Sequence, residues 1–100
     1  MYKITTYKAN GEITIYETQR PPTLKEVQDL VGGFITSVPK PYYLESNKDF
    51  FVRQHNVEKV TEVWCHEEAL LKAKPITNKF FEPAPWGSSL YGNVTVVEEL

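Results

Sequence analysis

The sequence is poor in the features that mark secreted, membrane-spanning or nucleic-acid-binding proteins. Its one cysteine, Cys65, cannot form a disulfide within the chain. It has no run of about 18 apolar residues and no charged-then-apolar leader. Its formal net charge of −2 lacks the basic excess that displaces counterions from DNA. We therefore expect a cytoplasmic protein without a membrane partner, and the charge argues against nucleic acid as a ligand.

Motifs for binding a metal or a phosphate are absent as well. With one cysteine and two histidines, a structural zinc site falls short of its usual ligands. His66-Glu67 does not begin a zinc-protease motif, because Leu70 rather than a second histidine stands four positions after His66. Gly32-Gly33 follows an expected helix, whereas a phosphate-binding loop precedes one. The sequence predicts no metal site and no cofactor.

Residues 65–68, Cys-His-Glu-Glu, are the only cluster of nucleophile, base and acid types. A catalytic cysteine needs a thiolate with a base within hydrogen-bonding distance. If Cys65 and His66 are neighbours in a strand, however, their side chains point to opposite faces. The other histidine, His55, can approach Cys65 only through the fold. We therefore favour a packed cysteine beside a histidine at a turn, and we rank a cysteine-dependent enzyme last.

Residues 2–19 have the alternating pattern of a β-hairpin. Asn10-Gly11 suits a two-residue type I′ turn, in which both central residues have positive φ. That turn places Ile4, Ile13 and Ile15 together on the face directed to the core. It also sets the cross-strand pairs, which are Lys8 with Ile13, Thr6 with Ile15 and Ile4 with Glu17.

A capped amphipathic helix is predicted over residues 24–32 or thereabouts. Thr23 is its N-cap, and Glu26 stands at the third helical position, as in a capping box. Gly32 or Gly33 ends the helix in a left-handed conformation. Its apolar residues recur at helical spacing and form one stripe, which consists of Leu24, Val27, Leu30 and Val31.

The remaining elements and the fold class follow from the same patterns. A short second helix is compatible with residues 77–82. We expect a single α+β domain over residues 1–100, in which a largely antiparallel sheet of about five strands begins with the hairpin and packs on one main helix. The segments that alternate as further short strands are 34–38, 50–53, 59–65 and 90–98.

Aromatic residues in proline-bracketed segments form one candidate binding surface. Tyr42 and Tyr43 follow Pro41, and Trp86 lies in a loop rich in proline, glycine and serine. Trp and Tyr are the residue types that most often anchor interfaces. The alternative, which we favour slightly, is that Trp86 folds back as a lid on the core.

Lysines concentrated between Glu68 and Glu82, where no other acidic residue stands, form a second candidate surface. Beside an aromatic ring they could bind an anion or a nucleotide. We favour a solvated face over an aromatic anchor at Phe80-Phe81, because the chain has few arginines for bidentate phosphate contacts. The three lysines are Lys72, Lys74 and Lys79.

Four short motifs carry a resemblance to a known family: LVGGFI at 30–35, HEEALLK at 66–72, PITN at 75–78 and LYGNV at 90–94. In these the chain resembles a family of small uncharacterised proteins encoded mainly by bacteriophages and other viruses. The sequence departs from the family pattern at His66, where Asn is expected, and at Ala69, where Gly is expected. The resemblance implies a viral accessory protein and names no reaction.

The expected function is that of a small non-enzymatic phage or viral accessory protein that binds a host or phage protein in the host-cell cytoplasm. The alternative is a small-ligand- or nucleotide-binding protein that sequesters its ligand, with lysines meeting phosphate. An exposed edge strand at either terminus could also pair two copies into a homo-oligomer.

Overall fold

The computed structural model describes residues 1–38, 48–66, 78–81 and 92–100. These residues form an α+β fold around a five-stranded antiparallel sheet with the strand order β2-β1-β5-β4-β3. The predicted fold class is confirmed, with its leading hairpin and main helix. The elements are, in chain order, β1 (Tyr2–Tyr7), β2 (Ile13–Thr18), α1 (Leu24–Val31), β3 (Ile35–Ser37), α3 (Lys48–Gln54), η1 (Val57–Lys59), β4 (Val60–His66), η3 (Lys79–Phe81) and β5 (Val94–Glu99).

The hairpin of β1 and β2 forms, but its turn differs from the predicted one. The backbone N–H of Gly11 donates to the carbonyl oxygen of Lys8 at 2.9 Å, and the N–H of Lys8 donates to that of Glu12 at 2.8 Å. Gly11 has a φ of 96°. The loop is therefore a turn followed by a left-handed glycine rather than a two-residue type I′ turn. The predicted register is wrong by one residue.

This one-residue shift changes the face that each side chain of β2 occupies. Ile13 pairs with Tyr7 and Ile15 pairs with Thr5, so both isoleucines lie on the opposite face of the sheet from Ile4. The prediction that the three isoleucines share a core-directed face is wrong. Ile4 is buried, whereas Ile13 and Ile15 are exposed because β2 is an edge strand.

Helix α1 begins and ends as its sequence predicts. The N–H of Glu26 donates to Thr23 Oγ1 at 3.2 Å within a capping box, and left-handed Gly32 donates its N–H to Gln28 O at 2.8 Å. The predicted apolar stripe is wrong at Leu24, whose side chain is 64% exposed. The buried side chains of the helix begin one turn later. The helix residues that are fully buried are Val27 and Val31.

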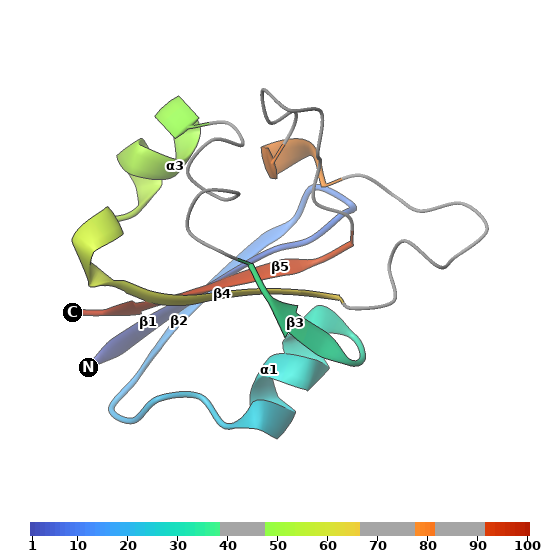
Figure 1. Cartoon of the computed structure of the whole chain (residues 1–100), viewed down its shortest axis with the longest axis horizontal. Coiled ribbons are helices and arrows are strands. Elements are labelled where there is room, and N and C mark those ends of the chain that lie inside the picture. The colour runs from blue at the N-terminus through green and yellow to red at the C-terminus, as the bar shows by residue number, and fades with distance from the viewer. Residues whose placement is uncertain (39–47, 67–77, 82–91) are drawn as a thin grey trace.

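Strand β5 is buried on both faces, which requires a covering layer on each side of the sheet. On one face, Val97 lies beside Ile4, and α1 packs there. On the other face, Val94 and Val96 belong to a hydrophobic core that includes Phe51 of α3. Figure 1 shows α1 and α3 on opposite sides of the sheet.

Residues 48–54 form helix α3, so the strand predicted at 50–53 is wrong. Phe51 and His55, four positions apart, are both buried, which is helical spacing. The polar character of His55 hides this stripe from a search for apolar periodicity. Within the described part of the predicted second helix near 77–82, a short 3-10 helix is present as η3.

The side chain of Asn78 connects η3 to the sheet through hydrogen bonds. Its side chain is fully buried, and its Nδ2 donates to the carbonyl oxygens of Tyr7 at 2.7 Å and Gly92 at 2.9 Å. Its Oδ1 accepts the backbone N–H of Phe80 at 3.1 Å. These bonds satisfy the buried amide and connect the end of β1, the approach to β5 and the start of η3.

The cap of α1 gives a direct stability test. Thr23→Ala removes the acceptor for the N–H of Glu26, and such a loss costs about 1 kcal/mol of the free energy of unfolding. Urea denaturation measures it. Lys25→Ala, an exposed change in the same helical turn, is the control and should stay within about 0.5 kcal/mol of wild type. Equal stability of the two variants would contradict the capping role.

Candidate functional site

Of the six binding residues predicted from the sequence, the structure describes Lys79. This residue is exposed at the start of η3, and its Nζ lies 5.4 Å from the centroid of the Phe80 ring. The ammonium therefore makes a cation–π contact with its own neighbour. The other five residues lie outside the described ranges, and they are Tyr42, Tyr43, Lys72, Lys74 and Trp86.

The aromatic residues beside Lys79 belong to the core. The Phe80 ring stacks on Phe50 with centroids 5.6 Å apart and lies 5.1 Å from Tyr7. Phe81 is fully buried. This packing supports the aromatic-anchor interpretation of the segment, in which Lys79 is a solvated residue over a packed aromatic cluster.

Cys65 and His66 take opposite faces of β4, as expected for neighbours in a strand. Cys65 packs partly buried against the core on the α3 side of the sheet, and burial raises the pKa of its thiol. His66 lies against Gly33 on the other side, where a Cβ at position 33 would come within 2.5 Å of the imidazole Nε2. The thiol and the adjacent imidazole are therefore not partners, and burial disfavours the thiolate that a catalytic cysteine needs.

A buried polar network joins three side chains that no pattern in the sequence predicted to meet. The hydroxyl of Tyr7 lies 2.7 Å from His55 Nε2, and His55 Nδ1 contacts a carboxylate oxygen of Glu98. The second oxygen of Glu98 accepts the backbone N–H of Asn56 at 3.2 Å. In the tautomer with the proton on Nδ1, that nitrogen donates to the carboxylate and Nε2 accepts from the tyrosine hydroxyl. The signal in the sequence was Glu98, an acidic residue that directly follows Val96 and Val97 in the strand.

Burial controls the electrostatics of this network. It lowers the pKa of His55, an effect that the carboxylate of Glu98 opposes. It also raises the pKa of Tyr7, and the charge of Glu98 raises it further. The side chains of all three residues are almost completely buried. The network can hold a proton in a defined place and fix α3 on the sheet, but it presents no atom to a substrate at the surface.

Metal and membrane sites do not arise within the described ranges. No group of three or more His, Cys, Asp or Glu side chains there is arranged to hold a metal ion. None of the helices in those ranges is long and apolar enough to cross a bilayer.

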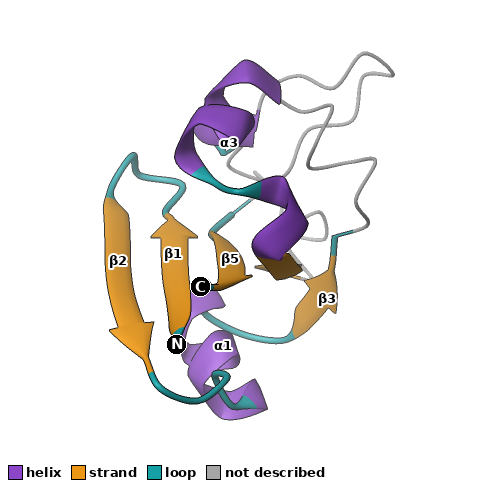
Figure 2. Cartoon of the chain, turned by 90° about the vertical axis from the view of Figure 1, so that its left-hand side faces the viewer, coloured by secondary structure: helices purple, strands orange, loops and turns teal. Residues whose placement is uncertain are grey.

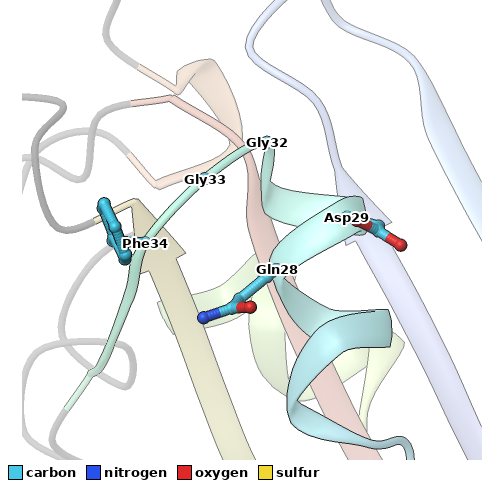
Figure 3. Close-up of a pocket in the computed structure, with 5 residues that line it drawn as sticks. All are labelled: Gln28, Asp29, Gly32, Gly33 and Phe34. Carbon is cyan, nitrogen blue, oxygen red and sulfur yellow. The ribbon is translucent and has the colours of Figure 1, made fainter.

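A surface hollow lies where α1 ends. It has a volume of about 440 Å³ and is lined by Gln28, Asp29, Gly32, Gly33 and Phe34. Phe34 is 62% exposed although it stands between the helix cap and β3. In Figure 3 the Gln28 side chain projects from the helix on the side where Phe34 lies, whereas Asp29 projects away from it. The sequence predicted Phe34 as the first residue of a strand over 34–38 and gave no sign that its side chain is exposed.

Several residues of the family-like motifs hold the fold together. Gly32 provides the left-handed cap of α1, and Asn78 joins η3 to the sheet. Asn93 accepts the backbone N–H of Ala9 at 3.0 Å and donates to the carbonyl oxygen of Leu30 at 3.4 Å. These positions therefore have sufficient structural roles and point to no reaction.

No family model, curated protein or solved structure matches this chain. The resemblance to phage-encoded proteins therefore stays an expectation from short motifs.

The lowered pKa of His55 predicts that stability falls in mild acid. The unfolded histidine titrates near its ordinary pKa of 6.5, whereas the folded one titrates lower. Protons therefore bind the unfolded chain first, and the free energy of unfolding decreases as the pH falls through and below about 6.5. Urea denaturation from about pH 7 to about pH 5 measures this decrease.

Two histidine variants assign the effect to one residue. In the His66→Gln variant the free energy of unfolding should still decrease in mild acid, whereas in His55→Gln this pH dependence should disappear. His55→Gln should also be less stable than wild type at every pH, because the substitution removes a partner of a buried carboxylate. A wild-type protein that gains stability over the same interval would contradict a neutral His55.

The environment of Cys65 predicts slow thiol labelling. An aromatic disulfide reagent at about pH 8 should react more slowly with the folded protein than with the same protein unfolded in urea, since the thiolate is disfavoured and half-buried. Faster labelling of the folded protein would instead show that Cys65 is activated and would support a cysteine-dependent enzyme.

Proposed function

We propose that this chain is a small non-enzymatic accessory protein, of phage or viral origin as its resemblance implies, that acts by binding a host or phage protein. The observation that carries the proposal is Phe34, a large apolar side chain exposed beside the hollow at the end of α1. Aromatic residues are enriched at protein interfaces, and a ring next to a concave surface is the usual arrangement of an interface anchor.

The charges around the hollow indicate what kind of partner fits it. The C-terminus of a helix carries a partial negative charge, and the last turn of α1 contains no basic residue to offset it. Phe34 places an exposed apolar ring beside this helix end. A partner surface that presents an apolar side chain next to a lysine or arginine would complement both features.

The described chemistry supports binding rather than catalysis. Cys65 has a raised pKa and faces away from His66, its neighbour in the strand. His55 is enclosed between Tyr7 and Glu98. Neither histidine forms a pair with the thiol in the arrangement that activates a nucleophile.

Affinity capture from host lysate tests the proposal with a matched pair of variants. Phe34→Ser should lower the affinity for the captured protein at least about tenfold, because an aromatic anchor contributes about 2 kcal/mol or more. Leu24→Ser is the control, since Leu24 is exposed to a similar degree, 64% against 62%, on the same helix–strand unit. It should leave the affinity unchanged.

The outcome also separates this surface from the one predicted by aromatic loops. Trp86→Ala and Tyr42→Ala complete the set of variants, and circular dichroism checks that each one folds. If the captured protein binds the Phe34→Ser variant as tightly as wild type but binds Trp86→Ala more weakly, the binding surface lies in the loops. Failure to enrich any protein above the control would contradict the proposed function.

A further inference from the structure

Strand β2 has an exposed edge without the usual protection against pairing. It forms one side of the sheet (Figure 2), and Ile13 and Ile15 on it are 45% and 59% exposed. Edge strands are normally short or carry lysine, proline or a bulge that prevents association with another strand. β2 is six residues long and has one charged residue, Glu17. The opposite edge strand, β3, has only three residues.

The ladder between β1 and β2 determines which backbone groups face outward. The hydrogen bond from Lys8 N–H to Glu12 O sets the alternation of the antiparallel pairs. Following the register from that bond, Thr14 and Tyr16 direct their N–H and C=O groups to β1. The corresponding groups of Ile13, Ile15 and Glu17 point away from the sheet, where an added strand would meet them.

We propose that this edge pairs with β2 of a second copy of the chain, antiparallel and about a two-fold axis at Ile15. In that register Ile15 faces Ile15 of the second copy, and Ile13 faces Glu17 of the second copy. Every outward-directed residue of β2 then meets an outward-directed residue, so no backbone group at the junction is left unpaired. Two-fold pairing of the same surface is the commonest way in which identical chains associate.

Side chains complement each other in the same register. Ile15 and Ile13 of both copies form a continuous apolar cluster on the α3 face, because diagonal neighbours on a sheet are within reach. On the α1 face Tyr16 meets Thr14, an aromatic and β-branched pair. The two Glu17 carboxylates lie at opposite ends of the junction, whereas a register centred on Glu17 would place them face to face.

This inference is independent of the proposed function. The hollow with Phe34 adjoins β3 and the end of α1, and β2 is the other edge of the sheet. A chain that self-associates through β2 can bind a partner protein at Phe34, and failure of either test leaves the other intact.

Sedimentation of the full chain over a range from about one to several hundred micromolar tests the proposal. Wild type should form a dimer. Ile15→Lys should raise the dimer Kd at least about tenfold, because it places two ammonium groups opposite each other. Ile13→Lys should keep the dimer, because the introduced ammonium faces Glu17 of the second copy, and added salt should weaken this variant more than wild type.

A cross-linking experiment gives a readout that does not depend on stability. In a Cys65→Ser background, Ile15→Cys should form an intermolecular disulfide on oxidation, since facing residues in a hydrogen-bonded pair have Cα atoms about 5.5 Å apart. Ile13→Cys should not. A wild-type chain that stays monomeric, or a dimer that Ile15→Lys and Ile13→Lys weaken equally, would overturn the proposal. Capture of an extended peptide by a monomeric β2 edge would overturn it too.

Discussion

The burial of β5 on both of its faces is the constraint on which the rest of the structure depends. Residues 94–98 are all buried, and a strand in that position needs a strand on each edge and a layer above and below. Strands β1 and β4 supply the edges. Helix α1 covers one face, and α3 with η3 covers the other. Each of these elements is too short to be stable alone, so the strand and its covering layers stabilise one another.

Glu98 shows how the same constraint generates the buried chemistry. A carboxylate on a strand that is covered on both sides must find donors inside the protein. His55 and the backbone of Asn56, just beyond α3, provide them. Asn78 does the equivalent for η3, with three hydrogen bonds to the backbone. The α3 layer is therefore held by directional polar bonds as well as by its phenylalanines, which fixes one packing of that layer on the sheet.

Local signals in the sequence predicted the elements that local chemistry determines. Thr23, Glu26 and Gly32 define α1 through caps that involve neighbouring residues. The hairpin was found, but its register was not, because Asn10-Gly11 fits either a two-residue turn or the end of a longer one. Burial of β2 side chains does not distinguish the two turns, since Ile13 and Ile15 are both exposed. Helix α3 was mistaken for a strand because Phe50 and Phe51 are adjacent, and its true stripe passes through His55, whose partner is 43 positions away. The surface at Phe34 was invisible for the same reason, since exposure depends on the whole fold.

The position of β5 has a consequence for how the chain reaches its structure. This strand follows the other described elements in the sequence yet lies between β1 and β4, so the contact between Thr6 and Thr95 spans 89 positions. Closing so long a loop costs chain entropy before any contact compensates for it, and contacts distant in sequence slow folding. The hairpin and α1 can form early from local interactions, but their apolar faces stay uncovered until β5 inserts. We expect a slow, cooperative step in which β5 inserts, and a nascent chain that exposes apolar surface until β5 has been made.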